Sequence, residues 1–187
     1  MTRPAVFSST VQEADIWLKT LCEEMRTDNA NTAYAALRGV LHELRDRLTI
    51  DEAAHLSAQL PMLIRGLFYE GWKPSVTPTK VRTVREFLDG VRDKAPGHDE
   101  LDPNRATQCV FQLLSSRIAP GEINQVIQML PKELRTLWPA RQQGDNLGQA
   151  AAAMGNIERG VAEVADPAQG EEREAQPTAQ KAESRES

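Results

Sequence analysis

Apolar residues recur along most of the chain at the spacing of amphipathic helices. The clearest case is the stretch 60–72, LPMLIRGLFYEGW, whose apolar residues follow the i, i+4, i+7 and i+8 positions of one helix face. Met62 and Leu63 widen this stripe, which predicts a helix with little surface in water. Pro61 lacks an N–H group and its ring clashes with the preceding turn, so we expect the helix to kink or restart there. Gly71 allows the left-handed turn with which a helix ends.

Two further helices are predicted before this stretch. Thr10 and Glu13 have the spacing of a capping box, in which each side chain satisfies the backbone N–H of the other, and this predicts the start of the first helix. A second helix should cover about residues 32–48, and a second capping box, of Thr49 and Glu52, should start a third. Because no segment alternates as a strand does, we predict an all-α fold. The residues expected on the inward face of the first helix are Val11, Ala14, Trp17, Leu18, Leu21 and Met25.

The helical pattern returns 70 positions later without a gap. Of the 33 residues from 36 to 68, nine are identical to the residue 70 positions further on. The start signals change their chemistry in the second copy, where Asp102 caps a helix that has Pro103 at its first position, and Pro120 opens the last helix. We therefore predict two tandem three-helix repeats that together form a six-helix bundle.

The predicted organisation of the chain has five segments. A short N-terminal arm covers residues 1–9, and the two repeats cover residues 10–72 and 79–139. Residues 140–165 are rich in Gly and Ala and predict a marginal helix, because each glycine weakens a helix by roughly 1 kcal/mol relative to alanine. Residues 166–187 have almost no apolar side chains and predict a disordered acidic tail.

Charge is distributed unevenly between the helical body and the tail. The whole chain has a formal net charge of −5, and residues 141–187, with five basic and nine acidic residues, account for −4 of it. The linker 73–85 has four basic residues and no acidic one. It is short and the chain is negative, so we interpret it as a solvated linker and predict no nucleic-acid partner.

The cellular compartment is predicted from the cysteines and from the absence of targeting segments. Cys22 and Cys109 lie in different segments without metal-ligand spacing, which indicates small core residues in a reducing compartment. The N-terminus has no apolar run followed by a cleavage site, and no window approaches the roughly 18 apolar residues that span a membrane. We expect a cytoplasmic protein without a membrane partner.

Side chains with catalytic or metal-binding chemistry are few. The sequence has no glycine-rich phosphate loop, nucleophile elbow or HExxH motif. His42 and His55 flank the turn between the second and third helices, but the corresponding positions of the second copy hold Gln112 and Gln125. We expect both histidines on exposed polar faces, and we predict no catalytic residue, no metal ligand and no cofactor.

Two pairs of arginines recur in the repeats. Arg47 and Arg117 lie at helix C-termini, where a cation offsets the helix dipole and can bind free carbonyls, so their structural explanation is sufficient. Arg65 and Arg135, one turn past each proline, have no such simple explanation. Arg65 is either a structural cation or the anchor of an anionic ligand. The candidate ligand or interface residues are Arg65, Tyr69, Trp72, Arg135 and Trp138.

Three runs carry a resemblance to one bacterial family. AYAALRGVLHELRDRL, DEAAHLSAQLPMLIRGLFYEGW and RATQCVFQLLSSRIAPGEINQVIQMLPKELRTLWP resemble the family called domain of unknown function 2267. The resemblance covers about residues 10–139. It implies an all-helical, small cytosolic bacterial protein. The family carries no established activity or catalytic residues, so the resemblance does not supply a function.

Three hypotheses about function remain open. The first is a non-catalytic helical binding or scaffold module of a bacterial cytosol, which binds a protein partner or itself. The alternative is a protein that binds an anionic small molecule in a pocket between the repeats, lined by aromatic residues at the repeat ends and anchored by Arg65. The third is a hydrolytic or metal-dependent enzyme, which would need His42 or His55 beside an acid in a cleft.

Overall fold

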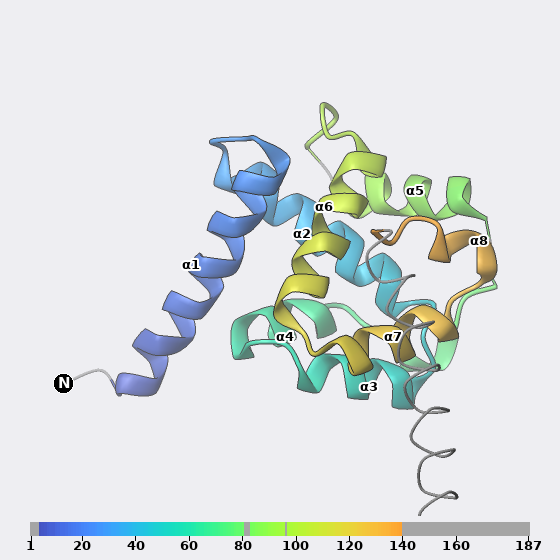
Figure 1. The fold of residues 1–187 in the computed structure, drawn as a ribbon, viewed down its shortest axis with the longest axis horizontal. Helices are drawn as coiled ribbons and strands as arrows, with labels where there is room; N and C mark the ends of the chain where they lie inside the picture. Colours follow the sequence, from blue (N-terminus) through green and yellow to red (C-terminus); the bar gives the residue numbers. More distant parts are fainter. Residues whose placement is uncertain (1–3, 81–82, 96, 140–187) are drawn as a thin grey trace, which may run out of the picture. The chain divides into compact units, whose positions relative to one another are not determined.

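The computed structural model describes residues 4–80, 83–95 and 97–139, and these residues form eight α-helices and one short 3-10 helix without a β-strand (Figure 1). The all-helical prediction is therefore confirmed. None of the described helices is long and apolar enough to cross a membrane. The elements are α1 (Ala5–Met25), α2 (Ala30–Arg45), α3 (Ile50–Ala58), α4 (Met62–Tyr69), η1 (Pro74–Val76), α5 (Val84–Asp93), α6 (Pro103–Arg117), α7 (Pro120–Met129) and α8 (Lys132–Arg135).

Every described residue belongs to one compact unit of the chain. The marginal helix predicted over 140–165 and the acidic tail predicted over 166–187 lie outside the described residues.

Each predicted third helix is divided in two at a proline, so six predicted helices become eight. Pro61 lies between α3 and α4, and Pro131 lies between α7 and α8. Each proline is the N-cap residue of the shorter helix that follows it. Because proline cannot donate a hydrogen bond to the preceding turn, the helix ends before it and restarts after it, and the break predicted at Pro61 is confirmed.

Most of the predicted start signals act as helix caps. The Thr49 side chain accepts a hydrogen bond from the Glu52 N–H, and the Glu52 carboxylate accepts one from the Thr49 N–H at 2.7 Å, which confirms the capping box before α3. Asp102 caps α6, with Pro103 as its first residue, and Pro120 opens α7. These signals are local in sequence, which is why they were predictable.

The predicted start of the first helix is wrong. The helix α1 begins at Ala5, so Thr10 and Glu13 lie inside it and form no capping box, and Thr10 is buried. The N-cap is Pro4, after which no further proline or glycine interrupts the helix until it ends. Residues 5–9, predicted as part of an arm, therefore add more than one turn to α1.

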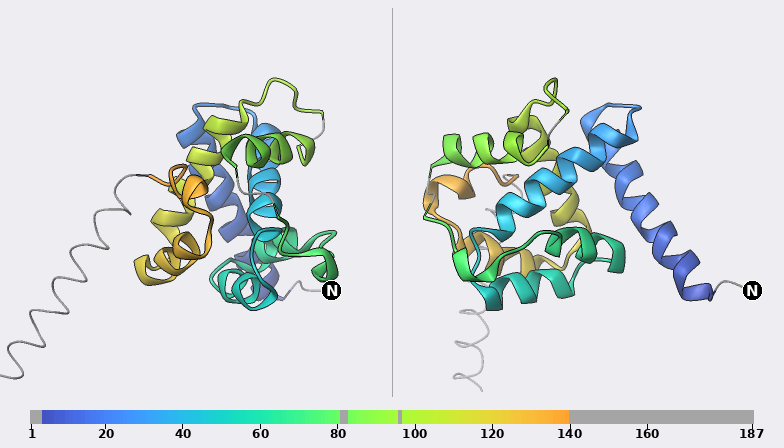
Figure 2. Two further views of the ribbon diagram at one scale, coloured as in Figure 1. Left: turned by 90° about the vertical axis from the view of Figure 1, so that its right-hand side faces the viewer. Right: turned by 180° about the vertical axis from the view of Figure 1, so that it is seen from behind.

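The first half of the chain, α1 to α4, and the second half, α5 to α8, pack against each other crosswise. The helix α1 packs on α6 as α5 packs on α2, while α2 and α6 contact each other and α3 contacts α7 (Figures 1 and 2). The helix α4 packs against α1, and α8 packs against α5. Because α3 and α7 begin 70 residues apart, as do α4 and α8, each of these contacts has a counterpart at the interval of the predicted repeat.

One main core is shared by the two halves. Its buried side chains come from both halves, among them Leu41 and Phe68 of the first half and Phe111 and Leu114 of the second. Burial of such a side chain contributes about 1.5–3 kcal/mol to stability, so the halves depend on each other. The largest fully buried side chains are Phe68, Phe87, Phe111, Leu21, Leu37, Leu41, Leu44, Leu48, Leu56, Leu60, Leu113 and Leu114.

The exposure of α4 differs from the prediction. Its Ile64 and Phe68 are buried, but Met62 is 57% exposed and Leu63 is 47% exposed. Val11 of α1, predicted to face inward, is 45% exposed. The prediction of a helix with little surface in water is therefore wrong for one side of α4, because the apolar stripe is wider than the core that the helix contacts.

Candidate functional site

Arg65 and Arg135, two of the predicted ligand or interface residues, bind backbone carbonyls at the ends of helices. Arg65 Nε donates to the carbonyl of Ser57 at 2.8 Å, and its Nη2 donates to that of Leu60 at 3.0 Å. Arg135 Nε donates to the carbonyl of Leu130, the position corresponding to Leu60, at 2.9 Å. A helix leaves its last carbonyls without intrahelical partners, and a cation suits that end. These contacts favour the structural explanation of Arg65.

The predicted aromatic residues lie in two separate places. Tyr69 Oη is 2.7 Å from Ser57 Oγ, and the Tyr69 ring lies 5.3 Å from that of Trp72. Trp138 is buried, and its Nε1 donates to Ser115 Oγ on α6 at 3.0 Å. Arg65 and Tyr69 thus both contact Ser57, whereas Trp138 lies against α6.

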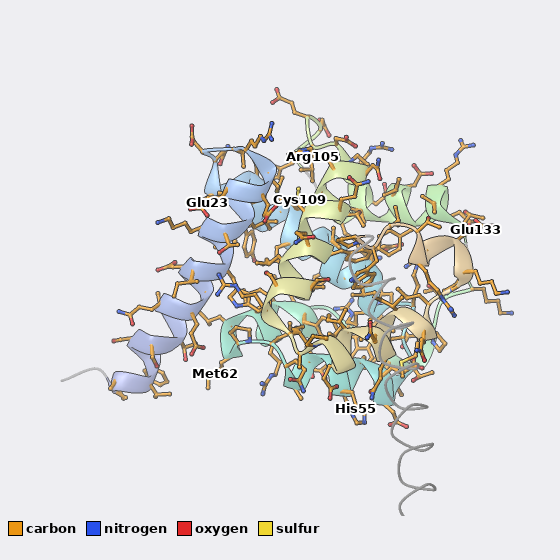
Figure 3. All side chains as sticks on the ribbon, in the orientation of Figure 1. Glu23, His55, Met62, Arg105, Cys109 and Glu133 are labelled. Atoms are coloured by element: carbon orange, nitrogen blue, oxygen red, sulfur yellow. The ribbon has the colours of Figure 1, made fainter. Side chains whose placement is uncertain are left out.

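The two histidines face different helices. His42 is 4% exposed, so the prediction of an exposed face is wrong for it, and its Nε2 lies 2.6 Å from the Leu67 carbonyl oxygen of α4. Burial lowers the pKa of His42 below 6.5, and the contact with Leu67 opposes this shift. His55 is exposed on α3, as predicted (Figure 3). In the described part of the chain, no group of three His, Cys, Asp or Glu side chains could hold a metal ion.

The C-terminal part of α2 holds a buried network of charges that the sequence analysis did not predict. The Glu43 side chain is 4% exposed and pairs with both Arg47 and Lys94. Lys94 Nζ also lies 3.1 Å from Asp46 Oδ2. The available signal was the i, i+4 spacing of Glu43 and Arg47, which usually marks an exposed pair. Here α5 covers the pair.

Arg45 joins the end of α2 to the end of α4. Its side chain is 4% exposed, and its Nη1 donates to the carbonyls of Phe68 at 2.6 Å and Glu70 at 3.0 Å. Its guanidinium carbon lies 6.0 Å from the centre of the Trp72 ring. These contacts hold the end of α4 against α2.

A groove with a largely apolar lining runs between α1 and α4, and we call it the α1–α4 groove. Its volume is about 510 Å³. Val11, Leu63 and Tyr34 are each 43–47% exposed there, while Asp15 and Glu70 supply its two carboxylates. The groove is lined by Val11, Ala14, Asp15, Leu18, Tyr34, Leu63, Ile64, Gly66, Leu67 and Glu70.

A second depression, of about 780 Å³, lies where α1 meets α6, beside Glu23, Arg105 and Cys109 (Figure 3). Arg105 Nη2 donates to the Glu24 carbonyl at 3.0 Å, and Cys109 Sγ lies 3.4 Å from the same oxygen. Burial raises the pKa of the Cys109 thiol. Arg105 and Cys109 therefore both contact the C-terminal part of α1.

A search against protein families identifies one family in this chain. The model described as "Uncharacterized conserved protein (DUF2267)" matches residues 14–137 and, in a second match, residues 84–182. The two matches begin 70 residues apart, which is the interval of the predicted repeat. The resemblance stated from the sequence is therefore confirmed. No curated protein matches the chain.

Proposed function

Because the chain belongs to the family of uncharacterized conserved proteins DUF2267, whose description states no activity, we propose a function from the surface of the molecule. The chain is a non-catalytic helical module that binds an amphipathic helix of a protein partner in the α1–α4 groove. The observation that carries this proposal is the half-exposed apolar lining of that groove. The proposed compartment is the bacterial cytosol, because Cys22 and Cys109 are free thiols.

The exposed apolar side chains follow helical spacing on both sides of the groove. On α1, Phe7 is 55% exposed and lies one turn before Val11. On α4, Leu63 and Leu67 lie one turn apart and both line the groove. A contiguous exposed apolar surface marks an interaction site more often than a scattered one does. Two parallel rows of apolar side chains suit the apolar stripe of a third helix.

The charges at the groove select the chemistry of the partner. Asp15 and Glu70 are its charged side chains, and both are acidic. Arg38 Nε donates to Glu70 Oε2 at 2.7 Å, and this hydrogen bond lowers the pKa of Glu70. We infer that the partner helix carries Lys or Arg beside its apolar stripe, because opposite charges at the rim favour association.

The proposal is tested with a fluorescent synthetic helix of Leu and Lys, titrated with the full chain and followed by anisotropy. Leu63→Glu places a charge in the apolar lining of the groove and should weaken binding at least about tenfold, or roughly 1.4 kcal/mol. Ile50→Glu is the matched control, because Ile50 is also about half exposed but lies at the start of α3. It should change binding by less than about twofold.

Three results would contradict this function. One is equal weakening by Leu63→Glu and Ile50→Glu. Another is equal binding of an acidic Leu and Glu helix, because the rim charges would then not select the partner. The third is a dimer of the full chain in sedimentation that Leu63→Glu dissociates, because a second copy would then occupy the groove.

A further inference from the structure

A cleft of about 610 Å³ lies where the linker before α5 meets the junction of α7 and α8. The linker and α8 lie side by side in Figures 1 and 2. The linker is fixed there because the Thr79 N–H donates to the Asp46 carbonyl at the end of α2 at 2.7 Å. We call this depression the linker cleft. Its polar lining consists of Arg47, Thr79, Lys80, Lys132 and Arg135.

Two hydrogen-bond donors in the lining of the linker cleft have no hydrogen-bond partner among the described residues. Arg47 is 7% exposed, and its Nη1 donates to the Glu43 carbonyl at 2.7 Å while its Nη2 lies against the Glu43 carboxylate. Within the described residues, Arg47 Nε and Thr79 Oγ1 are buried and form no hydrogen bond. A buried donor without a partner lowers stability, so such groups are rare in native proteins and need an explanation.

The charge of the linker cleft is the opposite of that of the whole chain. Lys80, Lys132 and Arg135 line it together with Arg47, and none of its described lining residues is acidic. By contrast, the depressions between α1 and α4, between α1 and α6, and between α3 and α7 each include two carboxylates. The Arg47 charge is balanced by Glu43. In a chain of net charge −5, the other three cations, Lys80, Lys132 and Arg135, produce a local positive potential around the cleft that attracts anions.

We propose that the linker cleft binds a phosphate group of a multiply charged small molecule. Lys80 and Lys132 are exposed and neutralise the phosphate charge at the mouth of the cleft. The Thr79 hydroxyl and Arg47 Nε–H, both buried in the free protein, donate to an oxygen that enters more deeply. A phosphate oxygen accepts several such hydrogen bonds, and charge-assisted ones are the strongest. The site is distinct from the α1–α4 groove.

The lining favours a small molecule over a nucleic acid. No aromatic side chain is present among the residues that line the linker cleft, so a base would find no ring on which to stack. The depressions elsewhere on the body carry carboxylates, and these repel a long phosphate backbone. A compact ligand with two or three phosphates matches the number of cations better.

The proposal is tested by titrating the full chain with pyrophosphate at constant ionic strength, by calorimetry and by the ³¹P spectrum of the ligand. Lys132→Ala removes a cation from the mouth of the cleft and should weaken binding about tenfold. Lys19→Ala is the matched control, because Lys19 is also exposed but lies on α1. It should change the dissociation constant by less than about twofold.

Thr79→Val separates a ligand-binding role from a structural role. The valine removes a buried hydroxyl that has no partner in the free protein, so the variant should be at least as thermally stable as the wild type. The same change should weaken pyrophosphate binding, because a donor in the lining is lost. A residue with only a structural role would not show unchanged stability together with weaker binding.

Saturable pyrophosphate binding that Lys132→Ala and Thr79→Val weaken, and that Lys19→Ala does not, is the expected result. The proposal is overturned if pyrophosphate does not bind saturably, or if Lys132→Ala and Lys19→Ala weaken it equally. It is also overturned if a single-stranded oligonucleotide binds the chain while pyrophosphate does not.

Discussion

The C-terminal ends of α2 and α6 occupy corresponding places in the two halves of the molecule, but their chemistry differs. Glu43 of α2 corresponds to Leu113 of α6, and the two are 3% and 0% exposed. Arg47 is buried, whereas the corresponding Arg117 is exposed and its Nη2 donates to Thr20 Oγ1 at 2.7 Å. The comparison teaches that the role of a recurring arginine depends on what covers it.

The covering helices differ in a matching way. A Cβ atom at Gly90 of α5 would overlap the Glu43 carboxylate, so only glycine leaves room for that group. The corresponding residue of α1 is Thr20, whose hydroxyl accepts the hydrogen bond from Arg117. Position 90 must therefore be glycine to admit the Glu43 carboxylate, whereas position 20 holds a side chain that binds the corresponding arginine.

Replacing Glu43 by Leu, the residue of the other half, should have the largest effect. Arg47 and Lys94 would lose their shared carboxylate, and an uncompensated buried charge costs about 3–5 kcal/mol. Chemical denaturation of the full chain measures this loss. Asp89→Leu, which removes an exposed ion pair with Arg92, is the control and should cost less than about 1 kcal/mol. If Glu43→Leu lowers the stability no more than Asp89→Leu does, the buried carboxylate is not needed and leucine can replace it, as at position 113.

Replacing Gly90 by Ala tests the close approach of α5 to α2. The added methyl group meets the Glu43 carboxylate, and such overpacking should cost about 1–3 kcal/mol. In the matched control, Gly66→Ala, the added methyl group meets nothing within 4 Å. That change should stabilise the chain by about 0.5–1 kcal/mol, because alanine favours a helix. Thermal unfolding of both variants measures these changes. We expect the unfolding midpoint to fall for Gly90→Ala and to rise for Gly66→Ala.

Replacing His42 by Gln, the residue at the corresponding position 112, should have the smallest effect, confined to low pH. Burial lowers the folded-state pKa of His42 below 6.5. Between that pKa and 6.5 the unfolded chain binds more protons than the folded chain, so stability falls as the pH falls through 6.5. The variant should lose this part of the pH dependence in urea unfolding above and below pH 6.5. An unchanged profile would show that His42 is not the responsible group.

Sequence reasoning predicted the features that depend on neighbouring residues. The break at Pro61, the cap at Thr49 and the start of α6 at Asp102 each follow from the chemistry of a few adjacent positions. The family was also predictable from the sequence, since it depends on residue identity along the chain.

The candidate site was harder to predict, because its contacts join distant segments. Arg65 was singled out for a ligand, but its partners are backbone carbonyls, which leave no pattern in a sequence. Glu43 has the pattern of a surface residue, and its burial arises from α5, far along the chain. Thr79 and Lys80 lie in a linker that we interpreted as solvated, and their place in the linker cleft depends on α7 and α8.

The comparison of Arg47 with Arg117 is tested most directly by the arginine Nε–H signals in a ¹⁵N–¹H NMR spectrum of the full chain, with each signal assigned by substitution to lysine. If Arg47 lines a phosphate site and Arg117 does not, saturation with pyrophosphate should shift the Arg47 Nε–H signal and leave that of Arg117 in place. Equal shifts of both signals, or a shift of Arg117 alone, would contradict the account that the two halves give their corresponding arginines different roles.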